Sequence, residues 1–448
     1  MKTKKLLWLL FFLPVAAHAQ DTTRLSLLFI GDIMQHDSQI ASAYDPQTKT
    51  YDYTSCFQFI APTLRAADLT IGNLEVTLAG PPYKGYPQFS APDSLASTLR
   101  DVGMDVLVTA NNHCVDQGKK GLERTIALLD TLGIQHTGTF SDSASRNRTY
   151  PLIIEKKGFR LSLLNYTYGT NGIPVPKPNI VNQLDTVQIK QDLLKAKAQH
   201  TDAIIVFMHW GVEYQNLPHN NQKKMAEFCF AHGAKLVIGS HPHVLQPIEW
   251  RKEQDQLLAY SLGNFVSGQR DRYKNGGALL NVTLKKIRGE DSTSQVSIDS
   301  TSYALDWIYR TTDASKDYYI MPIPQFEGDT LFVKNSAARL QLNEFARDSR
   351  ALFSKHNVEV RENTTLSRES MSYKIQLSKM MVLDSVSLVP PLNFYGAKME
   401  KDLRGVDRIV VGDFFDSELA KQAFLDIQKT VDKYARIILY FEHKRISD

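Results

Sequence analysis

The stretch from Lys235 to Gln246 carries two histidines, His241 and His243, directly after a short apolar run that ends at Gly239. An apolar run bounded by Gly and Pro is typical of a buried strand, and in an extended chain residues two apart point to the same side. Both imidazoles could therefore contact one ligand. Histidine is the commonest metal ligand, and open α/β sheets place their sites beyond the carboxyl ends of parallel strands. A single His-x-His pair is more often an ordinary loop, so the interpretation needs further ligands.

Further polar side chains lie at or just beyond the predicted ends of other strands. With the two histidines they form a set of candidate metal ligands: Asp32, Glu75, Asn112, His209, His241 and His243. Taken one at a time, an Asp or Asn after a strand is as often a turn former or a helix cap. Two carboxylates, three imidazoles and one amide suit Mn²⁺, Fe²⁺ or Zn²⁺ better than Ca²⁺ or Mg²⁺.

The size of this set predicts two divalent metal ions rather than one. Six ligands exceed what one open catalytic zinc needs, and they suffice for two ions roughly 3.5–4 Å apart that acidify a bridging water. His113, next to Asn112, is placed to protonate a leaving group as a general acid. Glu213 and Asn264, which also follow predicted strands, are candidates for the substrate side of the site.

The segments that must position these side chains alternate between two patterns. Apolar runs that predict strands cover 25–30, 67–71, 104–109, 150–154, 160–164, 203–208, 256–260 and 277–285. Amphipathic patterns predict helices over 93–102, 119–132, 186–198 and 221–232. Strands and helices in alternation, with polar residues at one set of strand ends, predict an α/β sandwich.

Length and composition limit the classes of protein to which the chain can belong. At 448 residues it is long enough for at least two domains. With 43% hydrophobic and 22% charged residues, it has the composition of an ordinary globular protein. A net charge of +4, without a basic patch interleaved with aromatic residues, argues against a nucleic-acid partner.

The first twenty residues predict export. Residues 1–19 combine a lysine-rich start, an apolar stretch from Leu6 to Val15 and an Ala-His-Ala cleavage site, which is the pattern of a secretory signal peptide. No later apolar run is long enough to span a bilayer, so we expect no transmembrane segment after cleavage and a location in the periplasm or cell envelope. The three cysteines, Cys56, Cys114 and Cys229, allow at most one disulfide and are interpreted as buried thiols.

The chain also resembles a known family from about Leu25 to Leu280. The shared motifs, in order, are GDIM at 31–34, IGNLE at 71–75, ANNHCVDQG at 110–118, HWGVEY at 209–214, GSHPHVLQPIE at 239–249 and SLGNF at 261–265. They resemble the CapA (poly-γ-glutamate capsule synthesis) family, a branch of the calcineurin-like metallophosphoesterases. The resemblance implies a metallophosphoesterase-like β-sandwich flanked by helices, which we expect to occupy residues 24–357.

The same resemblance implies a role for each candidate ligand. Asp32 and His243 would bind one metal, Glu75 would bridge, and Asn112, His209 and His241 would bind the other, with His113 as the acid. The chain departs from the parent pattern at Met34, where the phosphoesterases have a histidine. A thioether is a poor ligand for hard divalent ions, so the first metal lacks a ligand unless His36 or another group supplies one.

The C-terminal residues carry a second resemblance. Residues 358–371 are polar and lack periodicity, which predicts a linker. Residues 372–448 resemble a SPOR domain through YKIQL, RIVVGDFFDSELAKQAF and ARIILYFEHKRI. That implies a ferredoxin-like α+β fold, with one helix expected over 394–402, whose sheet binds peptidoglycan glycan strands. Tyr373, Ile375 and Leu377 alternate with polar residues and are the candidate glycan-binding residues. Such appendages can also serve only in dimerisation or packing.

Two functional hypotheses follow. The first is an exported metal-dependent hydrolase or transferase of the CapA type that acts on a surface polymer or an envelope substrate and is held at peptidoglycan by its SPOR-like tail. The second is a non-catalytic polymer-binding or assembly factor with a structural metal site. The metal content, and the effect of substituting Glu75 or His243, would distinguish them.

Overall fold

The computed structural model describes residues 21–289, 294–312, 316–364, 371–378, 392–402, 405–415, 417–441 and 444–445. The predicted signal peptide, residues 1–19, lies outside these ranges. Among the helices of the described ranges, none combines the length and the apolar character needed to cross a bilayer.

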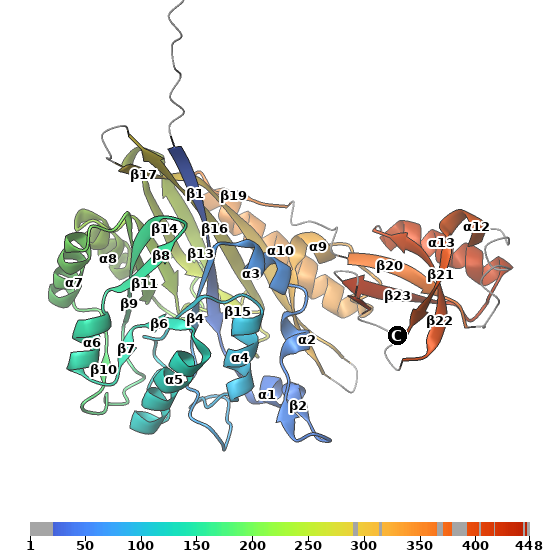
Figure 1. The fold of residues 1–448 in the computed structure, drawn as a ribbon, viewed down its shortest axis with the longest axis horizontal. Helices are drawn as coiled ribbons and strands as arrows, with labels where there is room; N and C mark the ends of the chain where they lie inside the picture. Colours follow the sequence, from blue (N-terminus) through green and yellow to red (C-terminus); the bar gives the residue numbers. More distant parts are fainter. Residues whose placement is uncertain are drawn as a thin grey trace, which may run out of the picture.

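The first large sheet is nine-stranded, in the order β18-β17-β16-β1-β4-β5-β6, with β15 beside β1 and β19 beside β17 (Figure 1). Strands β1, β4, β5 and β6 run parallel, whereas β16, β17 and β18 continue the sheet in antiparallel pairs. The bounds are β1 (Asp21–Ile33), β4 (Leu69–Leu74), β5 (Val106–Val108), β6 (Gln135–Thr137), β15 (Asn264–Val266), β16 (Gly276–Arg288), β17 (Ser294–Arg310), β18 (Tyr318–Pro322) and β19 (Arg361–Glu362).

The second large sheet is six-stranded, in the order β13-β14-β12-β11-β9-β8. Its four inner strands are parallel, and each edge strand is antiparallel to its neighbour. The bounds are β8 (Leu152–Lys156), β9 (Phe159–Thr167), β11 (Ala203–His209), β12 (Leu236–Ser240), β13 (Leu245–Arg251) and β14 (Gln256–Leu262).

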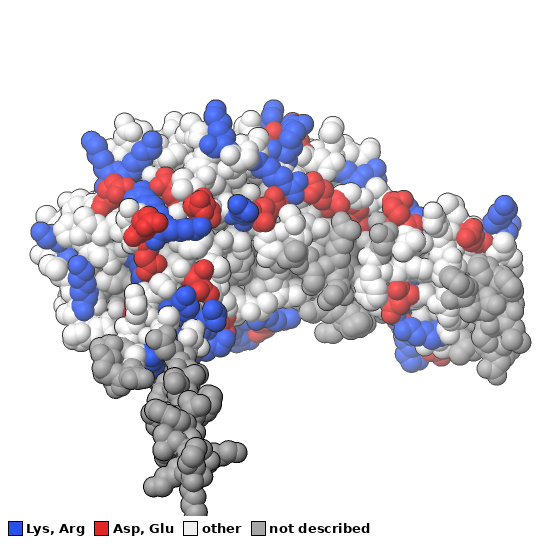
Figure 2. All heavy atoms as spheres, turned by 90° about the horizontal axis from the view of Figure 1, so that it is seen from above, with Lys and Arg blue, Asp and Glu red and all other residues white. Residues whose placement is uncertain are grey.

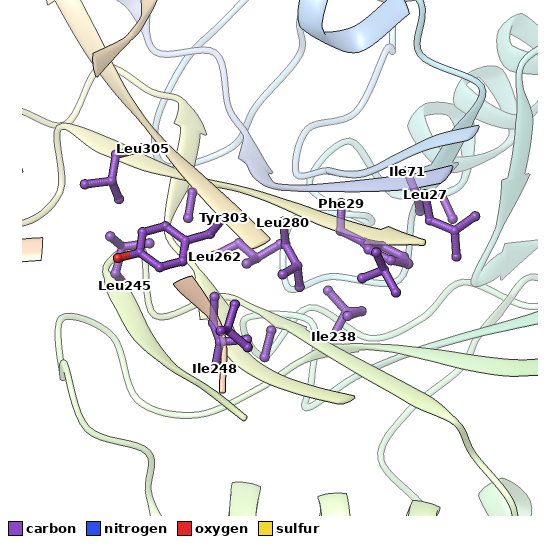
Figure 3. Close-up of a cluster of buried hydrophobic side chains, with 14 of the residues drawn as sticks. Leu27, Phe29, Ile71, Ile238, Leu245, Ile248, Leu262, Leu280, Tyr303 and Leu305 are labelled. Atoms are coloured by element: carbon purple, nitrogen blue, oxygen red, sulfur yellow. The ribbon is translucent and has the colours of Figure 1, made fainter. Parts of the chain in front are cut away.

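The main hydrophobic core lies between these two sheets. Leu27 and Phe29 of β1 meet Ile238 of β12 and Ile248 of β13 in one buried cluster (Figure 3). The intervening Leu28 of β1 points to the opposite face and joins a different cluster. Strand β1 is therefore buried on both faces, as its continuous apolar run predicts. Each fully buried Leu or Phe contributes about 1.5–3 kcal/mol of transfer free energy.

Helices cover the two outer faces, so the first domain has four layers (Figure 1). Helices α4 (Asp93–Asp101) and α5 (Gly118–Leu132) pack on the nine-stranded sheet through Leu95, Leu99 and Leu129. Helices α7 (Thr186–Ala198) and α8 (Asn220–Ala231) pack on the six-stranded sheet. This arrangement confirms the predicted α/β sandwich. The longest described helix, α10 (Ser336–His356), packs against β13 and β17.

Shorter elements complete the first domain. The remaining helices are α1 (Asp37–Ala43), α2 (Thr54–Phe57), α3 (Ala61–Ala66), α6 (Ser143–Thr149) and α9 (Ile323–Phe326), with one 3₁₀ turn at Lys252–Gln254. Two small ribbons pair β2 (Tyr44–Asp45) with β3 (Thr50–Tyr51) and β7 (Thr139–Phe140) with β10 (Ile180–Val181). Cys56, Cys114 and Cys229 are free and buried, as predicted.

Charged side chains of both signs are interspersed on the face of the molecule in Figure 2. On that face the basic and acidic residues alternate over short distances, which accords with the small net charge of +4.

The C-terminal residues form a separate antiparallel sheet in the order β21-β22-β20-β23-β24. Its elements are β20 (Met371–Gln376), α12 (Leu392–Tyr395), β21 (Ala397–Lys401), β22 (Asp407–Phe414), α13 (Ser417–Thr430), β23 (Arg436–Phe441) and β24 (Lys444–Arg445). The helix expected over 394–402 is wrong for most of its length, because 397–401 pair with β22 as a strand. The chain order β20-α12-β21-β22-α13-β23 is the order expected for a ferredoxin-like unit.

The first part of the predicted linker belongs to the first domain. The N–H of Val358 donates to the carbonyl of Ile248 over 3.0 Å, and the N–H of Asn363 donates to the carbonyl of Tyr303 over 2.6 Å. Strand β19 lies between these two contacts and pairs in parallel with β17. Residues 358–363 are therefore held on the first domain.

The three candidate glycan-binding residues are all buried. Ile375 and Leu377 are 0% and 1% exposed and pack beneath the helices of this unit. Tyr373 is 5% exposed, and its hydroxyl donates to Asp329 Oδ2 of the first domain over 2.6 Å. The alternation therefore marks buried positions, and a contact with glycan strands would need another surface of this unit.

Candidate metal centre

The strand ends of both large sheets converge on one buried site. Strand β1 supplies Asp32, and Glu75 follows β4; Asn112 follows β5, and His209 ends β11. His241 and His243 follow β12. All six predicted ligands are between 0% and 3% exposed, and the structure brings together residues that are up to 211 positions apart.

Two overlapping groups of these side chains could each hold a metal ion. In one, Glu75, His241 and His243 bring one ligand atom each within 4.8 Å of one another; in the other, Asp32, Glu75 and His209 do so. Glu75 belongs to both groups, which is the position expected for a bridging carboxylate. These groups place His243 with His241 and Asp32 with His209. The expected pair of Asp32 and His243 is also in contact, with His243 Nδ1 3.2 Å from Asp32 Oδ2.

Asp32 is held as an anion by its neighbours. Burial alone raises the pKa of this carboxyl, but hydrogen bonds from His243, Asn73 and the backbone N–H of His241 outweigh burial and lower it. His243 Nδ1 lies 3.2 Å from Asp32 Oδ2, and Asn73 Nδ2 donates to Oδ1 over 2.8 Å. Because its Nδ1 faces this carboxylate, His243 directs Nε2 towards Glu75, 3.7 Å away.

Glu75 is the carboxylate that both groups of ligands share. Its Oε1 is buried, has no hydrogen-bond partner among the described residues and lies 3.6 Å from His209 Nε2. Burial, and then the negative charge of Asp32, raise the pKa of Glu75 well above its usual value. A buried carboxylate of this kind needs a positive charge beside it to ionise.

His209 and His241 are held neutral, which is the form of the imidazole that binds metals. Burial, followed by the proximity of His243, lowers the pKa of His241 to about 3, and burial lowers the pKa of His209 as well. His241 Nδ1 is buried without a hydrogen-bond partner. Asn112 Oδ1 lies 2.9 Å from His209 Nε2 and so joins the second group. A carboxylate oxygen and an imidazole nitrogen that have no hydrogen-bond partner among the described residues lie in this one site. Both are suitable ligand atoms for a divalent cation.

His113 forms a buried dyad that sequence reasoning identified only in part. Its Nδ1 donates to Asp116 Oδ2 over 2.7 Å, and the same oxygen accepts the N–H of Phe89 over 2.8 Å. The ring of Phe89 packs edge-on against His113 with centroids 4.7 Å apart. This fixes the imidazole and leaves Nε2 to hold or release a proton. Asp116 was not assigned a role, although its spacing three residues after His113 in the same motif could have indicated it.

The geometry of the histidine pair differs from the sequence argument. His241 and His243 have φ angles of 97° and 57°, so the chain between them is not extended. Left-handed backbone is uncommon outside glycine and is strained for a side chain such as histidine. The two rings still belong to one group, with centroids 5.9 Å apart, but a tight turn rather than strand periodicity places them there.

Met34 and His36 do not supply the missing ligand. Met34 is 2% exposed and packs in the apolar cluster beneath α2 and α4, with Sδ 3.9 Å from Ser267 Oγ. His36 Nδ1 accepts the N–H of Gly268 over 3.1 Å, and His36 is in neither ligand group.

The two expected substrate-side residues have different surroundings. Asn264 is fully buried: His243 Nδ1 lies 3.1 Å from its Oδ1, and its Nδ2 donates to the carbonyl of Lys274 over 2.8 Å. Its side chain therefore orients His243, and its assignment to the substrate side stays a prediction. Glu213 is exposed in the loop after β11, where the N–H of Tyr214 donates to the carbonyl of Pro242.

The protein therefore has a four-layer α/β fold, with a candidate metal site of carboxylate and imidazole side chains where the strands of both sheets end. Residues 26–269 match the family described as "Bacterial capsule synthesis protein PGA_cap", and the chain belongs to this family of capsule synthesis proteins. The match ends before the C-terminal unit, which lies outside it.

Similar curated proteins carry names of the same kind. The chain is 30% identical over 271 residues to "PGA biosynthesis protein CapA" of Bacillus subtilis, covering 58% of this chain and 68% of that one. It is 29% identical over 283 residues to "Capsule biosynthesis protein CapA" of Bacillus anthracis, covering 59% and 65%. A "Probable polyglutamine synthesis accessory protein" of Mycobacterium tuberculosis is 26% identical over 246 residues, covering 49% and 62%. The 5′-nucleotidase of Candida albicans overlays with a TM-score of 0.33 at 11% identity over 73% of this chain and 58% of that one, a likeness too slight to carry an argument.

Proposed function

We propose that this chain is an exported, metal-dependent hydrolase or transferase of the CapA type, acting in capsule, surface-polymer or cell-wall metabolism. The observation that carries the proposal is the shared carboxylate: Glu75 belongs to both ligand groups, and its Oε1 is buried without a partner beside the orphaned Nδ1 of His241. Asp32, Glu75, Asn112, His209, His241 and His243 would hold two ions of Mn²⁺, Fe²⁺ or Zn²⁺. Such ions supply an acidified water and a positive charge for an oxyanion.

The residues of the chain itself provide the proton transfer. His113, whose Nδ1 is engaged by Asp116, presents Nε2 as the group that gives a proton to the leaving atom. Asn73 donates towards both Asp32 Oδ1 and Glu75 Oε2, so it sets the separation of the two carboxylates. The buried position of these groups excludes bulk water from the reacting atoms.

A second candidate is a non-catalytic assembly factor with a structural metal site. The position of Met34 favours it, because the side chain that replaces the expected histidine is packed in the core and leaves one metal with fewer ligands. The mycobacterial relative is named as a probable accessory protein, and that name accords with this second candidate.

The first test is metal content per mature chain by elemental analysis, combined with hydrolysis of bis(p-nitrophenyl) phosphate. We expect two metals per chain and turnover that His113→Ala abolishes while the metal content stays unchanged. Glu75→Gln should lower the metal content, and Glu253→Gln, at an exposed glutamate in the turn after β13, is the matched control. One metal or none, with no turnover after addition of Mn²⁺, would contradict the hydrolase and favour the assembly factor.

We further propose that the C-terminal unit holds the protein at peptidoglycan. The order of its strands and helices supports this, whereas the buried positions of Tyr373, Ile375 and Leu377 require another surface for the contact. Cosedimentation of the full mature chain with peptidoglycan sacculi, with and without stem peptides, tests the attachment. Equal recovery in the supernatant with and without sacculi would refute it.

A further inference from the structure

A pocket of about 600 Å³ lies next to the candidate metal centre, between the loop after β11 and helix α8. Its apolar lining comes from Leu184, Trp210, Val212, Met225 and Phe228. Its volume is within the range of pockets that bind small molecules. None of the predicted ligands lines it, so it is an additional feature of the molecule.

Tyr168 contacts both the pocket and the metal centre. It lines the pocket, and its ring packs on His241 with centroids 4.5 Å apart and stacks parallel to His209 at 6.2 Å. Trp210, at the back of the pocket, follows His209 directly in the chain. The ring of Tyr168 is 45% exposed. A ligand that contacts the histidines can therefore extend over this ring into the pocket.

The polar groups of the pocket floor are already engaged. Trp210 Nε1 donates to the carbonyl of Tyr260 over 2.9 Å. Gln222 uses both ends of its amide, with Oε1 accepting the N–H of His219 and Nε2 donating to Gln246 Oε1, each over 2.8 Å. Trp210 and Gln222 therefore offer a ligand mainly apolar surface, and Thr186, Asn221 and Lys224 add polar groups to the rest of the lining.

The loop after β11, which contributes Val212 to the pocket, carries further exposed apolar side chains. Val212, Tyr214 and Leu217 lie in one loop and are 41%, 47% and 52% exposed. Exposed apolar side chains that cluster beside a pocket mark a binding surface more often than scattered ones do.

We propose that this pocket binds an aliphatic chain carried by the substrate, while the anionic head group of the same molecule lies at the metal centre. The substrate class is therefore an amphiphile in which an apolar chain is joined to a phosphate or carboxylate group. The head-group part rests on the proposed function, whereas the chain-binding part rests on the pocket alone. Leu184, Val212 and Met225 contact the chain, and Trp210 and Phe228 close the back.

The test is the binding of n-alkyl phosphonates with butyl, octyl and dodecyl chains to the metal-loaded mature protein, by titration calorimetry below their micelle concentrations. We expect the Kd to fall roughly two- to fourfold for each methylene that enters the pocket. A phosphonate with an ether chain of octyl length should bind only as well as the butyl compound, because its oxygens stay hydrated.

Two variants test whether the dependence of Kd on chain length arises in this pocket. Val212→Asp places a charge in the pocket wall and should remove the dependence of Kd on chain length. Leu217→Asp is the matched control, since Leu217 is in the same loop and exposed but does not line the pocket, and it should keep that dependence. A Kd that is independent of chain length, no binding of any alkyl phosphonate, or equal losses in the two variants would overturn the inference.

These outcomes are separable from failure of the proposed function. Chain-length-dependent binding without turnover of bis(p-nitrophenyl) phosphate contradicts the hydrolase and supports the pocket. Turnover with a Kd that does not respond to chain length supports the hydrolase and overturns the pocket.

Discussion

At the scale of single residues, the contact between His113 and Asp116 gives a direct prediction. Asp116→Asn keeps the shape but removes the negative charge that orients the imidazole through the 2.7 Å bond to Nδ1. We expect kcat for bis(p-nitrophenyl) phosphate to fall about tenfold to a hundredfold, less than the 10²–10⁴ that a general acid contributes. Metal content and the thermal midpoint should stay close to the parent values.

The matched control for Asp116→Asn is Asp130→Asn. Asp130 also pairs with a histidine, His136 at 3.1 Å, but its side chain is 69% exposed. That substitution should leave kcat unchanged. If Asp116→Asn instead lowers the metal content as much as Glu75→Gln does, Asp116 supports the ligand shell rather than the proton donor.

The residues of the candidate site were largely identifiable from the sequence, because their types recur at the ends of apolar runs. The contacts between them were not. Asn73 lies in the IGNLE motif but has no assigned role in the sequence analysis, and its amide bonds to two carboxylates in the structure. Asn264 looked accessible because it follows a strand, but the chain folds back so that it contacts His243. These relationships depend on residues far apart in sequence, which no local pattern encodes.

At the scale of one element, β17 carries an unusual buried carboxyl. Asp306 is fully buried between β16 and β18, and neither of its oxygens has a hydrogen-bond partner among the described residues. Burial therefore raises the pKa of Asp306 well above its usual value. Between the ordinary pKa and this raised one, the unfolded chain loses a proton that the folded chain keeps. The free energy of unfolding must fall as pH rises through that window, by up to about 1.4 kcal/mol per pH unit.

Asp306→Asn should remove this loss, because an amide does not titrate. Chemical denaturation at pH 4, 5.5 and 7 measures it, and the stability gained by the variant should grow with pH. Asp271→Asn is the control, since Asp271 is exposed and the ion pair with Lys274 lowers its pKa. Stability curves of the variant and the parent that run parallel across this pH range would contradict the assignment.

Elements with strong periodicity were predicted well, and those defined by tertiary pairing were not. The helix predicted over 186–198 has the same bounds in the structure, because Asp185 caps it and its apolar residues recur at helical spacing. The segment 397–401 was predicted as a helix, and it is a strand because β22 is available to pair with it. The polar stretch from 358 has no periodicity, yet β17 fixes part of it as β19.

At the scale of the whole molecule, the C-terminal unit packs on the first domain through a limited contact. Tyr373, Ala420 and Leu439 join the cluster that contains Phe326 and Val333 of the first domain. Beside them a pocket of about 700 Å³, lined by aromatic residues of both units, separates the two surfaces. A single hydrogen bond across this contact should have a measurable effect on how firmly the two units associate.

The hydrogen bond from Tyr373 to Asp329 is the contact to test. Asp329 Oδ1 accepts the N–H groups of Leu331 and Phe332, so its carboxylate is fixed in position before Tyr373 reaches Oδ2. Tyr373→Phe removes a bond to a charged acceptor, worth about 1.5–3 kcal/mol. We expect the C-terminal unit to unfold several degrees earlier, so that differential scanning calorimetry shows its transition apart from that of the first domain.

Tyr434→Phe, at a 61%-exposed tyrosine of the same unit, is the control and should leave the transitions unchanged. Equal shifts in the two variants would mean that the units are coupled by apolar packing alone, because the loss of one specific bond would then have no effect of its own.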